Sequence, residues 1–310
     1  MESTTRNIKD KMEQLSRECK IYQGNCETVL SQIESVSIDA IITDPPYQYL
    51  DHELDTPYNE KLVFANMVRV LKEGAMLVLF GRGESFYRQC YRLHKLGMTF
   101  KEEIIWNKKQ PSSPITPISR IHETISVWSK GKGKVNKVYI DKLENLEADN
   151  NTETIIRDIK RMVSRINGIK TLEEFKKFQK NLKMRPNNSI SFDTTVRQKK
   201  MCPEAAGCVL QSYNRGIPMP SIIPCKREHY NMIHPTQKPL RLMKMITKLV
   251  SNIKDTILDP FGGVFSTGVA ALQLNRKFIG IEILEEYYEK GKMRLQNTID
   301  KKNGLTKEQE

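Results

Sequence analysis

The residues with the clearest chemical potential are Asp44-Pro45-Pro46-Tyr47, which follow the short, mostly apolar run 39–43. Such a run is typical of a buried parallel strand. Because neither proline donates to a strand ladder, the strand is expected to end at Asp44, at the edge where open α/β sheets bind ligands. A carboxylate, proline carbonyls and an aromatic face suit a planar heterocycle with an exocyclic amine. The plainer alternative is a rigid turn with an exposed tyrosine.

A second candidate site lies in residues 257–282, which read as a strand, a glycine loop, a helix and a second strand. Gly263 leaves space for backbone N–H groups to approach a ligand. Glu282 ends the second strand, where a carboxylate accepts hydrogen bonds from both ribose hydroxyls. This unit predicts an adenosine-bearing cofactor.

The same loop argues against NAD and ATP, since it has neither a GxGxxG fingerprint nor a Walker lysine motif. Asp259 stands beside the loop, where a carboxylate repels a pyrophosphate and attracts an ammonium group. The pattern therefore favours S-adenosylmethionine, whose amino-acid moiety carries an ammonium.

A third candidate, Thr236 with Lys238, precedes the predicted helix 239–253. A hydroxyl, an ammonium and open N–H groups at a helix N-terminus form a corner that binds a carboxylate. An ordinary helix start bounded by prolines is the alternative for these residues alone.

Strands and helices that position these residues alternate along the chain. Apolar runs predict strands at 20–24, 39–43, 75–80, 101–106, 124–128, 256–260 and 277–282, with helices at 25–33, 60–72, 84–96, 239–253, 268–274 and 285–299. This alternation is typical of an α/β, Rossmann-like, doubly wound and mostly parallel sheet. Residues 1–20 show a weak helical spacing in Ile8, Met12 and Leu15.

The chain has 310 residues, is 38% hydrophobic and carries a net charge of +13 with a pI of about 9.3. A charge of this size points to a polyanionic partner. Six scattered cysteines show no CxxC spacing, so we expect no metal site and a reduced, cytoplasmic location. With no signal peptide at the N-terminus and no apolar run of 18 residues, we expect no membrane contact.

The positive charge is concentrated in residues 129–228, which hold 21 Lys and Arg against 11 Asp and Glu. This stretch opens with a basic, glycine-containing hinge at 129–134 and continues with a helical block at 151–182. It predicts an inserted, basic and largely helical module between two halves of one core, residues 1–128 and 229–310. Arg185, Arg197, Arg215 and Arg227 are candidate contacts to bases or phosphates.

Three motifs follow one another along the chain: Asp44-Pro45-Pro46-Tyr47, then the segment 234–239, then Asp259-Pro260-Phe261 with Gly263. In this order the chain resembles the beta-type amino-methyltransferases of DNA, which place the catalytic loop first, a target-recognition insertion next and the cofactor loop last. Weaker matches include 104–108 and 122–124. The resemblance covers all but the tails and the insertion.

The resemblance implies a role for each matching position. Asp44 and the Pro45 carbonyl would hold the target amine, Pro46 would stiffen the loop, and Tyr47 would stack on a flipped-out base. The residues implied to surround S-adenosylmethionine are Asn25, Asp44, Thr236, Lys238, Asp259, Phe261, Gly263, Ser266, Thr267 and Glu282. No metal is implied.

Two positions depart from the family pattern. Asn25 stands where the family commonly has an aspartate facing the cofactor adenine, although an amide also offers a donor and an acceptor. Phe265 stands where the family usually has a second glycine. A phenylalanine there is expected to narrow the cofactor loop or to change the path of its backbone.

The expected function is site-specific transfer of a methyl group from S-adenosylmethionine to N6 of an adenine flipped out of double-stranded DNA. Asp at the first motif position favours adenine in the family, with cytosine N4 as the alternative. A catalytically impaired DNA-binding protein and an RNA methyltransferase are further alternatives. A bacterial or phage origin and a restriction-modification setting fit the resemblance. The recognition sequence, a homodimer and a partner restriction endonuclease remain open.

Overall fold

The computed structural model describes residues 11–47, 57–109, 118–149, 151–166, 212–226 and 237–304, and all structural statements below concern these residues. The chain divides into two compact units. The large unit comprises Met1–Val138 and Pro220–Glu310, and the inserted unit comprises Tyr139–Met219. Thr236 and Arg185, Arg197 and Arg227 lie outside the described residues.

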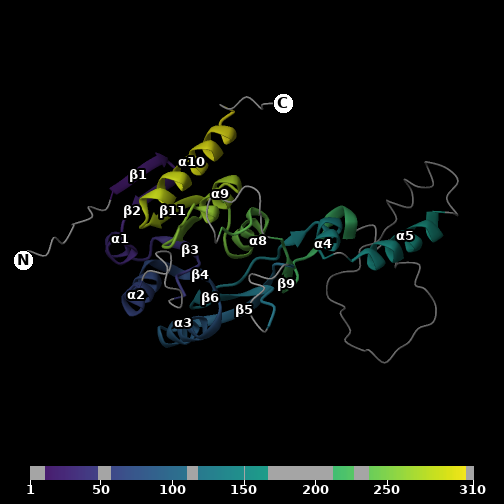
Figure 1. Cartoon of the computed structure of the whole chain (residues 1–310), viewed down its shortest axis with the longest axis horizontal. Coiled ribbons are helices and arrows are strands. Elements are labelled where there is room, and N and C mark those ends of the chain that lie inside the picture. The colour runs from purple at the N-terminus through teal and green to yellow at the C-terminus, as the bar shows by residue number, and fades with distance from the viewer. Residues whose placement is uncertain are drawn as a thin grey trace, which may run out of the picture. The chain divides into compact units, whose positions relative to one another are not determined.

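A mixed sheet forms the centre of the large unit, with the strand order β1-β2-β11-β10-β3-β4-β6-β5-β9 (Figure 1). The strands are β1 (Lys11–Ser16), β2 (Cys19–Gln23), β3 (Ile38–Thr43), β4 (Leu71–Gly81), β5 (Met98–Asn107), β6 (His122–Lys130), β9 (Ile222–Pro224), β10 (Thr256–Asp259) and β11 (Lys277–Glu282). The run β2-β11-β10-β3-β4 is parallel throughout. The predicted Rossmann-like α/β architecture, mostly parallel, is confirmed.

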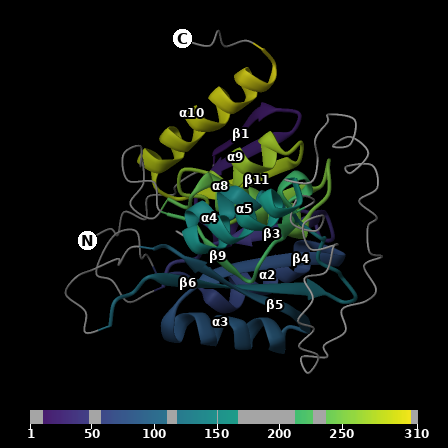
Figure 2. The ribbon, with the colours of Figure 1, turned by 90° about the vertical axis from the view of Figure 1, so that its right-hand side faces the viewer.

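Helices cover both faces of this sheet (Figures 1 and 2). One layer contains α1 (Cys26–Gln32), α2 (Glu60–Val70) and α3 (Gly83–Lys95), and the other contains α8 (Leu240–Val250), α9 (Ser266–Gln273) and α10 (Glu285–Lys302). The first layer packs on apolar strand residues that include Ile41, Leu77 and Leu79. Burial on both faces explains why the central strands read as nearly continuous apolar runs.

β6 is an exception to the parallel arrangement, because it runs antiparallel to both β4 and β5. Parallel neighbours need a crossover of a dozen or more residues, usually a helix, whereas a strand that pairs with its predecessor in sequence is usually antiparallel. β6 follows β5 among the described strands and lies between β4 and β5 in the sheet.

The helical spacing expected in residues 1–20 is wrong for the described part of that segment. Lys11–Ser16 forms strand β1, which pairs antiparallel with β2 through a short connection. Met12 is exposed and the next residues alternate in burial, a period of two that fits a strand. Pairing with β2 outweighs the weak local pattern.

The inserted unit contains α4 (Lys142–Ala148), α5 (Thr152–Ile166) and the short pair β7 (Tyr139–Ile140) and β8 (Ile217–Pro218). Lys142, the first residue of α4, connects α4 with α5 and with the segment at Ser212. Its Nζ lies 2.6 Å from Asp158 Oδ2 and 2.9 Å from Ser212 Oγ. The Lys142 ammonium also lies over the ring of Tyr213.

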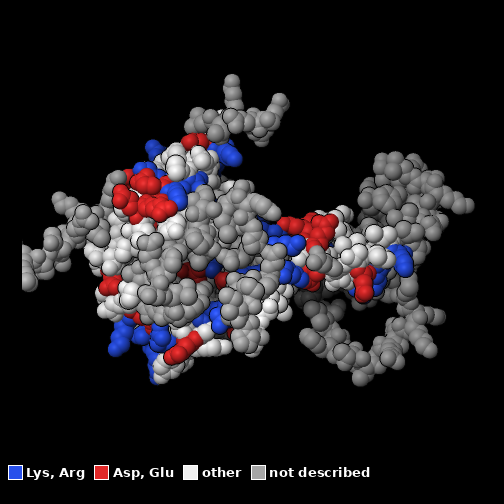
Figure 3. All heavy atoms as spheres, viewed as in Figure 1, with Lys and Arg blue, Asp and Glu red and all other residues white. Residues whose placement is uncertain are grey.

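Charges are unevenly distributed over the surface of the large unit (Figure 3). Lys and Arg side chains gather where Figure 1 places α2 and α3, while both signs lie side by side over α10. Ion pairs such as Lys290–Glu286 account for the mixed surface of α10. Among the described helices, none has the length and apolar character that a membrane span requires.

Candidate active site

The Asp44–Tyr47 loop follows β3, which lies between β10 and β4 in the middle of the sheet. The strand ends at Thr43, one residue before the predicted end at Asp44 and just ahead of the two prolines, which cannot donate to the ladder. The Asp44 side chain is 23% exposed, and its Oδ1 accepts a hydrogen bond from the Tyr47 hydroxyl at 2.9 Å. The loop therefore holds the Asp44 carboxylate in a fixed orientation at the carboxyl end of β3.

Asp44 is the outer end of a row of four charges that alternate in sign. Lys238 Nζ lies 2.6 Å from Asp44 Oδ2 and 2.8 Å from Glu123 Oε2. The other carboxylate oxygen of Glu123 lies 3.3 Å from Lys108 Nζ. We call Asp44, Lys238, Glu123 and Lys108 the charge row.

Aromatic rings hold the ammonium groups of the charge row from the side. Lys238 Nζ lies 5.2 Å from the ring centroid of Phe80 and 5.5 Å from that of Trp106. The Trp106 indole N–H donates to the Cys225 carbonyl at 2.7 Å, which fixes the ring. Cation–π attraction is strongest where water is excluded, as it is around these buried groups.

Burial and ion pairing oppose each other along the charge row. Burial raises the pKa of Asp44, and the Lys238 ammonium acts against this. Burial alone would lower the pKa of Lys238, but Asp44 and Glu123 raise it above its ordinary value. Burial likewise works to raise the pKa of Glu123, but Lys238 and Lys108 outweigh it and lower that pKa.

The glycine loop connects β10 with α9 and lies at the end of the strand next to β3. Asp259 Oδ1 accepts from the Phe261 N–H at 3.2 Å, and its Oδ2 accepts from the Thr267 hydroxyl at 2.6 Å. Glu282 Oε2 accepts from the Gly263 N–H at 2.7 Å. Both predicted carboxylates therefore frame the loop through hydrogen bonds.

Both loop carboxyls are buried, and burial raises their pKa values. The pKa of Asp259 rises to about 7, and that of Glu282 rises above its ordinary value despite hydrogen bonds from the N–H groups of Leu284 and Gly263. A carboxylate has about four acceptor positions, so each of these two groups can also accept from a ligand. Two buried carboxyls beside a glycine loop suit a ligand that brings positive charge and hydroxyl donors.

The backbone of Phe265 is unusual for a residue with a side chain. Its φ of 54° lies in the left-handed region, which glycine adopts at no steric cost. Its ring is fully buried and packs edge-on against Phe278 and Tyr288. The ring therefore fills the core behind the loop, and the effect of Phe265 on cofactor binding stays a prediction.

Two further predicted residues lie at element ends near this loop. Asn25 caps α1, with Oδ1 accepting from the Glu27 N–H at 2.8 Å, and the Gly24 N–H beside it donates to the Glu282 carbonyl. Ser266 Oγ accepts from Arg294 at 3.2 Å at the start of α9. The structure thus brings Asn25 to the same edge as the glycine loop.

Comparison with known proteins decides the family. A profile of the DNA methylase family, in its N6/N4 group, matches residues 38–293. The chain belongs to this family. The methylase is 55% identical over 62 residues to the DNA adenine methyltransferase YhdJ of Escherichia coli, a match that covers 20% of this chain and 21% of YhdJ.

Two other comparisons extend over most of the methylase. The type II methyltransferase M1.MboII of Moraxella bovis is 25% identical over 86% of this chain and 93% of its own length. The crystal structure of the M1.HpyAVI–SAM complex has a TM-score of 0.54 and 23% identity, and covers 89% of this chain and 98% of the other. The fold is therefore shared along nearly the whole chain.

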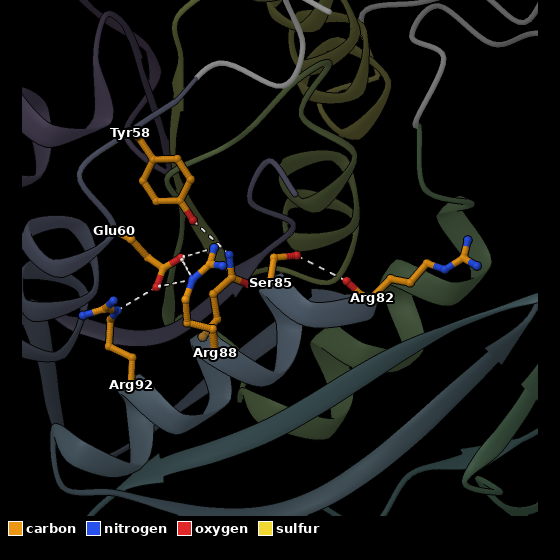
Figure 4. A network of polar contacts seen from close by, with 7 residues as sticks. Tyr58, Glu60, Arg82, Ser85, Arg88 and Arg92 are labelled. Carbon is orange, nitrogen blue, oxygen red and sulfur yellow. Dashed lines mark hydrogen bonds and ion pairs between the residues drawn. The ribbon is translucent and has the colours of Figure 1, made fainter. Parts of the chain in front are cut away.

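A polar network connects Tyr58 and Glu60, at the start of α2, with α3 (Figure 4). Glu60 accepts hydrogen bonds from Arg88 and Arg92 of α3 at 3.0 and 2.7 Å. Gln89 donates to the Tyr58 hydroxyl at 3.0 Å, and the Tyr58 ring lies 4.9 Å from that of Phe261 in the glycine loop. This network therefore links α3 to the glycine loop.

Sequence reasoning gave no role to Glu123, Lys108 or Tyr58. Glu123 immediately precedes the predicted strand 124–128, and Lys108 follows the last residue of β5, so both charged side chains stand beside strand ends. An ionisable side chain is seldom fully buried unless it is paired. The pairing partner lies 115 positions from Glu123 in the sequence, so spacing could not identify it.

Proposed function

We propose that this methylase transfers a methyl group from S-adenosylmethionine to N6 of an adenine that has left the DNA duplex. The observation that carries the proposal is the position of Asp44, held by Tyr47 and Lys238 at the end of β3. The adjacent strand β10 ends in the glycine loop. A group bound at Asp44 and a cofactor bound at the loop would therefore be neighbours.

The chemistry of the glycine loop fits S-adenosylmethionine, which supplies an electrophilic methyl group on a sulfonium centre. Buried Asp259, with its raised pKa, would gain a cationic neighbour from the amino-acid ammonium. Glu282 would accept from the ribose, and Asn25 would face the adenine. Thr236 and Lys238 would lie near the carboxylate, with Phe261, Gly263, Ser266 and Thr267 lining the pocket.

The Asp44–Tyr47 loop would make an exocyclic amine reactive. The lone pair of such an amine is delocalised into the base, so the free amine is a poor nucleophile. Hydrogen bonds from the amine to Asp44 and to the Pro45 carbonyl would favour a tetrahedral nitrogen and free the lone pair for in-line attack on the sulfonium methyl group. The carbon–sulfur bond breaks as the carbon–nitrogen bond forms, S-adenosylhomocysteine leaves, and the nitrogen then loses a proton. Tyr47 would stack on the base, and most of the rate enhancement would come from positioning and electrostatics.

Adenine is favoured over cytosine by two observations. Asp44 occupies the first motif position, where aspartate accompanies adenine in the family that the sequence resembles. YhdJ, which shares 55% identity over 62 residues, is named a DNA adenine methyltransferase. Cytosine N4 is the second candidate because the loop chemistry serves either amine.

The partner we propose is duplex DNA, contacted by the basic insertion. Extruding a base costs a few kcal/mol of stacking and pairing, which contacts to the insertion would offset. A DNA-binding protein with an impaired cofactor pocket stays the alternative; it was based on Phe265, whose ring lies in the core. A cytoplasmic location, a homodimer and a partner endonuclease remain predictions.

The deciding experiment measures transfer of labelled methyl from S-adenosylmethionine to unmethylated duplex DNA, followed by nucleoside analysis. We expect N6-methyladenine, and duplex RNA of the same sequence should remain unlabelled. N4-methylcytosine would replace the proposed base, and an absence of any methylated nucleoside would overturn the proposed transfer.

Cofactor binding should depend on pH through Asp259. Its pKa of about 7 in the free protein means that half of the carboxyls are protonated at neutral pH. The cofactor ammonium favours the ionised form, so binding below pH 7 must release a proton and the affinity should fall. We expect about tenfold weaker binding at pH 6 than at pH 8.

Calorimetric titrations in two buffers of different ionisation enthalpy test this coupling. Proton release should be detectable near pH 6 and absent near pH 8. Asp259→Asn is the matched control, because an amide has no proton to release and its affinity should vary little with pH. An unchanged affinity of the native protein between pH 6 and 8 would argue against an ammonium at Asp259.

A further inference from the structure

The charge row brings together side chains from four separate elements of the large unit. Asp44 follows β3, Lys238 precedes α8, Glu123 lies in β6, and Lys108 follows β5. Lys108 is 2% exposed, Lys238 9% and Glu123 15%, so water screens these charges weakly. The proposed function uses Asp44 and Lys238 but gives no task to Glu123.

Glu123 divides its two oxygens between the two lysines. Oε2 lies 2.8 Å from Lys238 Nζ, and Oε1 lies 3.3 Å from Lys108 Nζ. A lysine side chain has a flexible four-carbon stem and three N–H donors, so a single carboxylate does not fix the position of its ammonium group. A second carboxylate and two ring faces do fix the Lys238 ammonium, and its distance from Asp44 follows from that.

We propose that Glu123 is a positioning residue for methyl transfer, which holds the Lys238 ammonium so that Asp44 presents its carboxylate correctly to the substrate amine. This inference rests on the proposed function. Because Lys238 shares its charge between Asp44 and Glu123, Asp44 keeps enough acceptor strength to bind an amine N–H. Without Glu123 the ammonium would belong to Asp44 alone and would compete with the amine.

Several titratable groups face Asp44 and affect its pKa. Tyr47 donates to it from its own loop, Lys238 from the start of α8, and Glu123 acts from β6. Asp259 of β10 is also near enough for the two carboxyls to affect each other. The negative charge of Glu123 raises the pKa of Asp44, so its removal should lower that pKa.

Glu123→Gln is the first variant, measured in single turnovers at saturating cofactor and DNA. We expect the transfer rate to fall by about 10- to 100-fold, the range for a small displacement of a reacting group. Cofactor affinity should stay within about threefold of the native value. The acid limb of the rate profile, which reports ionised Asp44, should move to lower pH. A purely structural role of Glu123 would not move it.

Glu103→Gln provides a matched control, because Glu103 is an exposed glutamate on the neighbouring strand β5. Its rate and pH profile should match those of the native protein. A second variant addresses the buried charge that Glu123→Gln leaves on Lys108. Lys108→Met combined with Glu123→Gln removes both charges and should fold, since replacing a buried ion pair is often neutral.

The double variant separates positioning from charge compensation. If Glu123 acts through Lys238, the double variant keeps both the slow transfer and the shifted acid limb. Recovery of the native rate in the double variant would overturn the proposal, because Glu123 would then serve only to neutralise Lys108. A native rate in Glu123→Gln would also overturn it. Failure of the native chain to methylate DNA would instead overturn the proposed function.

Discussion

Asp44→Asn is expected to reduce methyl transfer at least about a thousandfold, while cofactor affinity changes by less than about threefold. The amide replaces a charged acceptor with a neutral one at the position where the substrate nitrogen gains positive charge. It also ends the 2.6 Å ion pair with Lys238. Lys238 keeps Glu123 at 2.8 Å, so the charge row should persist without its outer member.

Single-turnover methylation of duplex DNA and equilibrium binding of S-adenosylmethionine give the two numbers to compare. Asp300→Asn is the matched control, since Asp300 lies on α10 and contacts Gln296. It should transfer methyl groups at the native rate. Turnover of Asp44→Asn within tenfold of the native value would remove Asp44 from the catalytic role that we propose.

Local pattern was sufficient to predict most of the large unit. The apolar runs at β3, β4, β10 and β11 are buried on both faces, so their composition alone marks them as central strands. The helix 60–72 was predicted two residues too long, because Leu71 already pairs with Ile38 and begins β4. Such ends depend on tertiary pairing, which a single stretch of sequence does not contain.

The N-terminal strand and the antiparallel direction of β6, whose strand itself was predicted at 124–128, were missed for the same reason. The spacing of Ile8, Met12 and Leu15 is too weak to separate a helix from an edge strand. The pairing of β1 with β2 determines that the described part is a strand. The order of strands around β6 depends on how β5 and β4 are placed, which sequence periodicity does not report.

At the candidate site, motifs located the loops but not the partners of their side chains. Asp44, Asp259 and Glu282 lie at adjacent strand ends because parallel strands present their carboxyl ends at one edge. The contact of Lys238 with both Asp44 and Glu123 required the fold. Phe265 shows a second limit, since the motif gives its position in the loop but not the direction of its side chain, which packs in the core.

Three glycines explain how the fold accommodates Phe265. A Cβ at Gly280 or at Gly291 would lie 2.6 Å from an atom of the Phe265 ring, and one at Gly262 would lie still closer. The ring therefore occupies a slot that exists because β11, α10 and the cofactor loop each lack a side chain there. We call it the glycine slot. Through this slot the glycine loop packs on β11 and α10.

Phe265→Gly should therefore lower the free energy of unfolding by about 3–5 kcal/mol, although glycine suits the left-handed backbone better. The lost ring leaves a cavity between Phe278 and Tyr288. Cofactor affinity should fall as well, because the loop loses the packing that fixes Gly263. Denaturant unfolding and equilibrium cofactor binding measure the two effects. A variant as stable as the native protein would show that the slot is not a structural support.

Gly291→Ala tests the same slot from the other side, and the sign of its effect is informative. Alanine in a helix interior is normally more stable than glycine by about 1 kcal/mol. At Gly291 the new methyl group would meet the Phe265 ring, so we expect a net loss of about 1–3 kcal/mol. Asn297→Ala, at an exposed position of the same helix, should show only the helix gain. In a Phe265→Gly background the penalty at Gly291 should largely disappear, because the ring that causes it is gone. A penalty that persists there would assign the clash to the Val264 backbone, 3.1 Å away, and not to the ring.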